Sequence, residues 1–416
     1  MELTVHELKK LFKNPVTVAA IILIFAFNLM TFVSSGNSYY SIGNEDWKEH
    51  VQTARENGAY FKGAITDEWS AKYKAEVEAF RRDPANRVSA EEAEEIIKEK
   101  EAQGYNPDFV RENMEWAFLR DDVKRSNAYN RYEPVEVSMG FYETAASLGQ
   151  QYAQIYTLQN PGAKGELLAD AALGDYGRLA SDYTAYYNYD LGYQWMSGMV
   201  ASTHSTAGVL IIVALAGIFC SEYTRKTDAL LLSTKHGRQT LASAKIRAGL
   251  IFAIGAWAVI MGTNASLTTL CYGWEGWEAY WQDWLINTAP FRWNQGTALV
   301  TAVATSFFGT IYFALLIMAV SAVSKNSFAA LLAGLLLLIV PSMDVSAIGL
   351  DFIYSLFSAM PATIMRGILI WSSYRPVALF GQVLDGQYIL LAAALLVSIL
   401  AAAAAVRTFK NHQVSN

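Results

Sequence analysis

Charged residues are scarce in this chain, and several long stretches contain none. Asp, Glu, Lys and Arg account for 17% of the 416 residues, while 53% are hydrophobic. An average soluble domain carries about 25% charged residues. The formal net charge is −6 and leaves no basic face to bind phosphates, so we expect no nucleic-acid partner. The composition points instead to membrane spans joined by charged connections.

Cysteine is almost absent too, and the usual metal-binding and nucleotide-binding patterns are missing. Cys220 and Cys271 are the two cysteines, and both lie at the ends of apolar runs, where we expect them to pack rather than form a disulfide or bind a metal. The five histidines show no zinc-type spacing. Gly162-Ala163-Lys164-Gly165 lacks both the spacing and the hydroxyl residue of a phosphate-binding loop. We therefore expect no cofactor in this chain and no ATP hydrolysis by that route.

Long apolar runs are what the sequence does contain. A helix needs about 20 mainly apolar residues to cross the hydrocarbon core of a bilayer. Six stretches meet or approach this length: 16–33, 196–220, 249–272, a part of 296–324, 327–343 and 388–406. The fifth is short and ends near Pro341. We predict an all-α polytopic membrane protein with six transmembrane helices.

The basic residues assign the two ends of these spans to opposite sides of the membrane. Lys and Arg are enriched in cytoplasmic connections. If the spans alternate in direction, one face receives the basic start of the chain, the loop after the second span, Lys325, and the basic end. Both termini are therefore predicted to be cytoplasmic. The basic residues at the start and end of the chain are Lys9, Lys10, Lys13, Arg407 and Lys410.

The first 38 residues could alternatively be a cleaved signal peptide. The uncharged run from Val16 to Val33 is longer than the usual apolar region of about 7–15 residues in such peptides. The residues before it have apolar side chains at helical spacing with lysines between them. This pattern favours a cytoplasmic interfacial helix followed by a retained span, together forming residues 1–34.

The segment between the first two spans differs in composition from the rest. Residues 35–197 hold 28 acidic and 17 basic residues. Ser89 and Glu92 form a capping box, and Asn106-Pro107 is typical of a helix start. We therefore predict a large, mostly helical extracytoplasmic domain over residues 35–195, followed by spans two to six over 196–416.

Aromatic residues gather at two places where the chain meets the predicted membrane surface. Tyr176 to Trp195 is rich in tyrosine, and Trp277, Trp281 and Trp284 recur at spacings of four and three. Tyr and Trp prefer the headgroup region. We expect a helix entering the headgroup region at the first place and an interfacial helix at the second; an aromatic ligand surface is the alternative for both.

Ionisable residues are nearly absent inside the spans, which bears on the energy source of any transport. Proton- and ion-driven transporters usually embed such residues in the bilayer. The clear case here is His204, and its neighbour Ser205 invites comparison with a catalytic pair. Adjacent helical side chains point about 100° apart, so a packing or interface role is favoured over that of an intramembrane hydrolase. Asn28 and Asn264 are predicted to form hydrogen bonds between helices.

The cytoplasmic loop over residues 221–248 has an unusual pattern for a simple connection. Thr227 can cap a short helix whose apolar face is Leu230, Leu231 and Leu232. Ser233 to Gly237 ends this helix, and a new helix begins near Arg238. Three consecutive leucines offer more apolar area than a membrane-facing stripe requires, and some of it could fill a groove on a partner protein.

This pattern resembles the permease subunits of type-2 ABC transporters. The resemblance rests on a Glu, a Thr five residues later, a Leu-Leu core, a small hydroxyl residue, an Arg and a Lys seven residues further on. The matching residues here are Glu222, Thr227, Leu230, Leu231, Leu232, Ser233, Arg238 and Lys245. The sequence departs from the family pattern at Lys226, where Gly is usual, and at Lys235, where Pro is usual.

The resemblance implies that the loop carries a coupling helix, Thr227 to Ser233, which docks on a separate cytoplasmic ATPase subunit. Glu222 would lie near the membrane gate, and Arg238 and Lys245 would brace the loop. Positive-inside anchoring is the simpler reading of the two bases. An exposed pair with Arg225 or Lys226 is the simpler reading of Glu222.

The resemblance also implies the surroundings of the chain. It predicts an outer re-entrant segment over residues 344–387, broken at Pro361, and a second permease subunit, alike or related. ATP would bind to the partner subunit, and the protein would be an exporter of unknown cargo in the bilayer of a bacterial plasma membrane. The alternative function is a membrane receptor or sensor whose outer domain binds a ligand and whose basic loop signals to a cytoplasmic protein.

Overall fold

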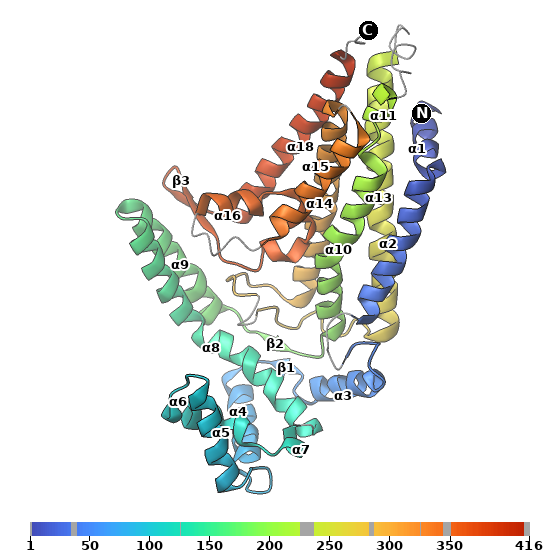
Figure 1. The fold of residues 1–416 in the computed structure, drawn as a ribbon. Helices are drawn as coiled ribbons and strands as arrows, with labels where there is room; N and C mark the ends of the chain where they lie inside the picture. The colour runs from blue at the N-terminus through green and yellow to red at the C-terminus, as the bar shows by residue number, and fades with distance from the viewer. Residues whose placement is uncertain are drawn as a thin grey trace.

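A computed structural model describes most of the chain and gives a helical bundle with a helical lobe at one end (Figure 1). The described residues are 2–34, 40–124, 126–224, 237–282, 287–324, 326–343 and 351–411. For some residues inside helices, including Arg238, the description is limited to the backbone.

The bundle contains five helices that are long and apolar enough to cross a membrane among the described residues. They are α2 (Pro15–Ser34), α10 (Leu191–Leu215), α13 (Gly237–Cys271), α14 (Gln295–Val323) and α18 (Gly386–Asn411). The fifth predicted span is the 13-residue helix α15 (Ser327–Ile339), continued by a 3₁₀ turn, η2 (Val340–Ser342). At 1.5 Å per residue α15 is about 20 Å long, shorter than the roughly 30 Å hydrocarbon core. Six spans therefore stay a prediction.

Within the bundle, α10 and α14 are central and α2 and α18 are peripheral. In α10 and α14, more than half of the residues in the most apolar stretch are buried. In α2 and α18, fewer than a quarter of the corresponding residues are buried. Gly208 of α10 lies against the Leu338 side chain, which a Cβ at this position would meet at 2.7 Å. Small residues of this kind let membrane helices approach closely without a hydrophobic driving force.

Asn28 of α2 and Asn264 of α13 confirm the predicted hydrogen bond between helices. Both side chains are fully buried. Asn28 Nδ2 donates to Asn264 Oδ1 at 2.8 Å, and Asn264 Nδ2 donates to Asn28 Oδ1 at 3.3 Å. The reciprocal pair fixes the peripheral helix α2 against α13.

Replacing Asn28 by leucine is expected to lower the free energy of unfolding by about 1 kcal/mol, because it leaves the Asn264 amide buried without this partner. The pair Asn28→Leu/Asn264→Leu should recover much of the loss. Equilibrium unfolding of the four proteins in detergent measures the coupling. Additive single effects would contradict the pairing.

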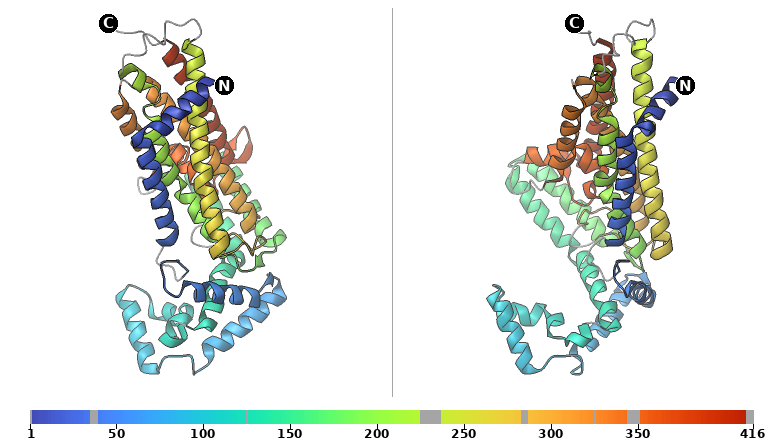
Figure 2. Two further views of the ribbon diagram at one scale, coloured as in Figure 1. Left: turned by 90° about the vertical axis from the view of Figure 1, so that its right-hand side faces the viewer. Right: turned by 45° about the vertical axis from the view of Figure 1, so that its right-hand side comes forward.

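The chain begins with α1 (Glu2–Lys13), which bends away from α2 at Asn14 and packs on α13 (Figure 2). Asn14 Oδ1 accepts from the backbone N–H of Val16, and Pro15 occupies the first position of α2, as helix starts favour. The short amphipathic helix predicted before the first span is thus a separate element. Both chain ends lie at the same end of the bundle (Figure 1).

The segment between α2 and α10 is mostly helical, as predicted, and lies toward the other end of the bundle (Figure 1). The Ser89–Glu92 capping box and the Asn106 cap are both present. Its elements are α3 (Trp47–Tyr60), β1 (Gly63–Ala64), α4 (Asp67–Arg82), α5 (Ala90–Ala102), α6 (Pro107–Asn113), η1 (Glu115–Phe118), α7 (Asp121–Lys124), α8 (Asn127–Gln159), α9 (Ala163–Asp182) and β2 (Tyr186–Tyr187).

The two predicted interfacial helices are wrong. Tyr176 to Trp195 is split, because α9 ends at Asp182, β2 pairs with β1, and α10 starts after Asp190. Between α13 and α14, Gly273 and Gly276 have φ of 78° and 87°, and the described residues from Gly273 to Gln282 form turns rather than a helix. A Cβ on Gly276 would lie 2.1 Å from the Tyr189 carbonyl oxygen, so this close approach requires glycine.

The tryptophans of this second segment differ in burial. Trp281 is buried, with its ring centroid 5.4 Å from that of Trp293. Trp277 lies against Gly296 at the start of α14 and is half-exposed. Trp284 lies outside the described residues. The same segment is joined to α9, whose Tyr176 donates to the Thr288 carbonyl oxygen.

The segment before α18 consists of broken pieces, as the prolines predict. It contains α16 (Asp351–Ser358), α17 (Pro361–Met365) and the 3₁₀ helix η4 (Gly367–Ile370). The sequence reading missed a hairpin of β3 (Pro376–Leu379) and β4 (Gln382–Asp385). Its two turn residues, Phe380 and Gly381, have φ of 53° and 78°, as a two-residue type I′ turn requires. Phe380 hides this turn in the sequence because Asn or Asp usually precedes the glycine.

Candidate functional site

The predicted coupling residues divide into those that the structure describes and those that it does not. Thr227, Leu230, Leu231, Leu232 and Ser233 lie outside the described residues. The backbone of Arg238 belongs to the first turn of α13. Glu222 in α11 (Cys220–Thr224) and Lys245 in α13 are fully described, and they flank the undescribed residues 225–236.

Lys245 joins the two flanks of the loop. Its Nζ lies 3.0 Å from Glu222 Oε1 and 2.9 Å from the Ile218 carbonyl oxygen. A third acceptor, Glu7 Oε2 of α1, lies 2.8 Å away. An ammonium group has three protons to donate, so this lysine is fully satisfied.

Lys10 of α1 links the two carboxylates from the other side. Its Nζ lies 2.7 Å from Glu7 Oε1 and 3.4 Å from Glu222 Oε1. Two acids and two bases therefore alternate, and they join α1, α11 and α13. We call these four residues, Glu7, Lys10, Glu222 and Lys245, the charge cluster.

Most of the charge cluster is buried. The exposed fraction is 2% for Lys245, 3% for Glu7 and 8% for Glu222. Glu222 is thus not the exposed side chain of a simple surface pair. Buried charges are tolerated when they are paired and hydrogen-bonded, and removing one partner is then strongly destabilising.

Electrostatics keep the Glu7 carboxyl ionised. Burial acts to raise its pKa, but the charges and hydrogen bonds of Lys245 and Lys10 outweigh burial and hold the pKa below its ordinary value. For Lys10, burial acts to lower the pKa, while Glu7 and Glu222 together raise it above the ordinary lysine value. Both Glu7 and Lys10 are therefore charged at neutral pH.

Acidification is expected to remove the contribution of Glu7. Because its pKa is lower in the folded chain, the stabilisation is present above the unfolded value of 4.5 and is lost as pH falls through the folded value. Melting temperatures of the wild type and Glu7→Gln should differ most near pH 7 and converge as the pH falls below 4.5 and through the lower folded value. The exposed Glu112→Gln is the matched control, and a pH-independent difference for Glu7→Gln would contradict the pairing.

Sequence reasoning missed Glu7 and Lys10 as members of the site. The buried positions of α1 are Thr4, Glu7 and Leu11, at spacings of three and four. A glutamate on a stripe that faces a neighbouring helix was the available signal. Its partners, however, lie more than 200 residues away, and no local pattern reveals them.

The break between α10 and α11 is held in place by α14. The backbone N–H groups of Phe219 and Cys220 donate to Ser321 Oγ at 3.0 and 3.4 Å. Ser321 is fully buried. The point at which the chain leaves the bundle toward Glu222 is therefore fixed to a central helix as well as to the charge cluster.

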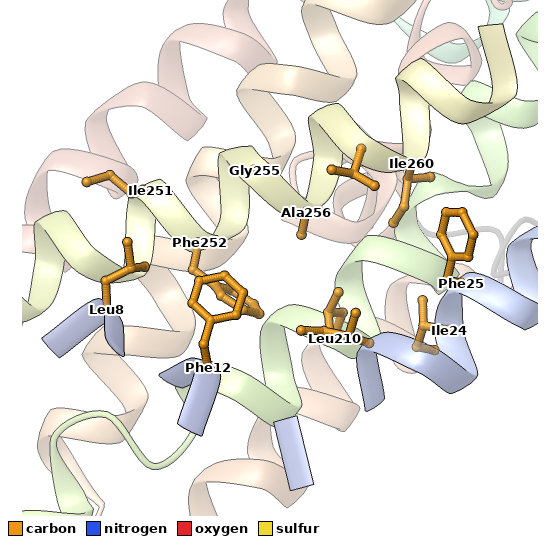
Figure 3. A pocket seen from close by; sticks show the side chains of 12 residues that line it. Leu8, Phe12, Ile24, Phe25, Leu210, Ile251, Phe252, Gly255, Ala256 and Ile260 are labelled. Atoms are coloured by element: carbon orange, nitrogen blue, oxygen red, sulfur yellow. The ribbon is translucent and has the colours of Figure 1, made fainter. Parts of the chain in front are cut away.

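An apolar groove lies next to the cluster, between α1, α2, α10 and α13 (Figure 3). Its volume is about 320 Å³. Its walls carry no polar side chain, so nothing in it can orient a charged or hydrogen-bonding ligand. The lining residues are Leu8, Phe12, Ile21, Ile24, Phe25, Leu210, Ile251, Phe252, Gly255, Ala256, Val259 and Ile260.

Comparison with known proteins gives one result for nearly the whole chain. Residues 1–406 match the family model described as ABC-2 family transporter protein. The match includes all four residues of the charge cluster. The comparisons with curated proteins and with solved structures found no match.

Proposed function

This chain belongs to the ABC-2 family of transporter proteins, and we propose that it is the permease subunit of an ABC exporter that is driven by a separate ATPase. Members of this family are the membrane components of transporters and are not themselves catalytic. The proposal adds the direction of transport, the docking loop and the residues that transmit the force.

The charge cluster is the observation that supports this proposal. A loop that only fixed orientation would need basic residues at the surface, not a lysine with 2% exposure that binds both flanks of the loop. Lys245 and Glu222 connect the loop to α13 and α11, while Glu7 connects it to α1. Force on the loop would therefore reach three helices at once.

The proposed mechanism follows from this arrangement. The ATPase partner binds ATP and supplies the chemical energy when its subunits dimerise. Residues 227–233 dock on that partner and move with it. Glu222 and Lys245 carry the displacement to α10 and α13, and Arg238 braces the loop at the start of α13. The helices then rearrange around a path shared with a second permease subunit.

The location of the protein follows the same proposal. Both termini and the loop would be cytoplasmic, in the plasma membrane of a bacterium. The segment between α2 and α10 would then face outward, with the pieces from α16 to η4 lining the outer exit. The large size of that outer segment suggests that it caps the exit or contacts cargo.

Affinity purification from native membranes tests the proposal. A nucleotide-binding protein is expected to co-purify, and its ATPase activity should change when it is reconstituted with this chain in liposomes. The exporter assignment would be contradicted if the chain were recovered without any nucleotide-binding protein and the ATPase activity of candidate partners were unchanged.

A further inference from the structure

Arg366 is a cation at a central position of the bundle, and its Nε has no hydrogen-bond partner among the described residues. It lies between α17 and η4, and its side chain is half-buried. Its Nε is shielded from solvent and has no hydrogen-bond partner, and the described part of the chain offers Arg366 no ion pair. The other arginine of this segment, Arg375, donates from Nη1 to Ser358 Oγ at 2.7 Å.

The backbone holds Arg366 at the seam between α10 and α14. The next residue, Gly367, has φ of 64°. A Cβ there would lie 2.5 Å from the Ala302 carbonyl oxygen of α14 and 2.7 Å from the Val200 side chain of α10. Glycine is therefore required, and the close packing fixes the backbone from which the Arg366 side chain projects.

His204 of α10 lies one turn beyond Val200, the residue that packs on Gly367 next to Arg366. Its Nδ1 lies 2.8 Å from the Ala201 carbonyl oxygen, so Nδ1 carries the proton of the neutral ring. Nε2 is left for another group. An anion beside it would favour the imidazolium form, which presents Nε2–H as a second donor.

Five of the described helices around this pair carry no acid that could neutralise it. Helices α10, α14, α15, α17 and η4 contain no Asp or Glu. An unpaired guanidinium among apolar side chains is costly, and ionisable residues at membrane depth usually mark a ligand or ion path. The matching ligand has a carboxylate or phosphate for the guanidinium fork and an apolar body for the surrounding side chains.

We propose that Arg366 and His204 bind the carboxylate or phosphate group of an amphipathic molecule that this transporter carries. This inference rests on the proposed function, because it names the chemical class of the cargo. The anion-binding role distinguishes the Arg366–His204 site from the apolar groove beside α1, which has no group to recognise an anion.

Binding of dodecyl phosphate and dodecanol to the purified full chain in phosphatidylcholine nanodiscs tests the proposal. Dodecyl phosphate should raise the melting temperature of the wild type and bind at least about tenfold tighter than dodecanol. Arg366→Gln should remove this preference, Arg366→Lys should keep part of it, and His204→Gln should weaken it several-fold. Arg375→Gln is the matched control and should respond like the wild type.

The melting temperatures of the ligand-free proteins separate an effect on folding from an effect on binding. Removing an unpartnered guanidinium should leave the ligand-free melting temperature of Arg366→Gln unchanged or raise it. Equal binding of the phosphate and the alcohol by the wild type would overturn the site, as would a preference that survives in Arg366→Gln.

A phospholipid headgroup offers the same phosphate chemistry as a cargo molecule. A second binding experiment, with an anionic lipid in the discs, distinguishes the two. Discs containing phosphatidylglycerol should still bind dodecyl phosphate if the site receives cargo. Complete displacement by this lipid would assign the site to a structural lipid and overturn the cargo role. The assay needs no ATPase, so a failure here, with an ATPase that co-purifies, contradicts the site alone.

Discussion

Replacing Lys245 by methionine is expected to destabilise the chain by about 3–5 kcal/mol, the largest single effect in the described structure. The ammonium group is buried and touches Glu7 Oε2, Glu222 Oε1 and the Ile218 carbonyl oxygen. Its removal takes one cation away from two buried carboxylates; among the described residues the half-exposed Lys10 still contacts each of them. The melting temperature in detergent and transport in liposomes with the ATPase should both fall.

Two matched variants separate this effect from a general loss of charge. Arg247→Met removes an exposed base two residues further along α13 and should leave the melting temperature nearly unchanged. Adding Glu222→Gln to Lys245→Met removes one of the two buried acids and should restore part of the lost melting temperature. A melting temperature for Lys245→Met that equals that of Arg247→Met would show that the charge cluster does not support the fold.

Replacing Leu231 by aspartate is expected to abolish transport while the chain still inserts and folds. The proposed coupling helix presents Leu230, Leu231 and Leu232 to a groove on the ATPase, and a carboxylate buried there without a partner costs several kcal/mol. Arg238→Glu should uncouple transport through the base of the same loop. The measurement is ATP-dependent transport beside the melting temperature of each variant.

The control places the same change on an exposed helix outside the bundle, away from the loop. Leu158, near the C-terminal end of α8, is 82% exposed, and Leu158→Asp should transport like the wild type. Normal transport by both Leu231→Asp and Arg238→Glu would remove the docking role from the loop and favour the receptor or sensor alternative.

The periodic features of the sequence predicted most of the bundle. Uncharged runs gave the positions of α2, α10, α13, α14 and α18 because a bilayer-spanning helix must be apolar over its whole length. Ser89–Glu92 and Asn106 gave helix starts because capping is local chemistry. Asn28 and Asn264 were expected to bond between helices, and they bond to each other.

Features that depend on contacts between distant segments could not be predicted in this way. Trp277 and Trp281 have helical spacing, yet Gly273 and Gly276 turn the chain, so that Trp281 is buried while Trp277 lies half-exposed against Gly296 of α14. The length of α15 was ambiguous because its apolar run ends at Pro341. The hairpin turn at Phe380 was hidden because its residue type rarely adopts that conformation.

The candidate site shows the same division. Glu222 and Lys245 were found through a family pattern, whereas Glu7 and Lys10 were found only when folding brought α1 against α13. Arg366 lies in the segment predicted to be re-entrant, and no local pattern distinguishes it. The unpartnered Nε in the described structure is a property of the packed seam between α10 and α14.

A crosslinker at Leu231 tests the central claim most directly, because it asks which protein touches the loop. The variant carries a photoreactive phenylalanine at this position in native membranes, and the product is identified by mass spectrometry after illumination. A crosslink to a nucleotide-binding protein is the predicted result. A crosslink only to lipid, or only to a protein without a nucleotide-binding site, would contradict it.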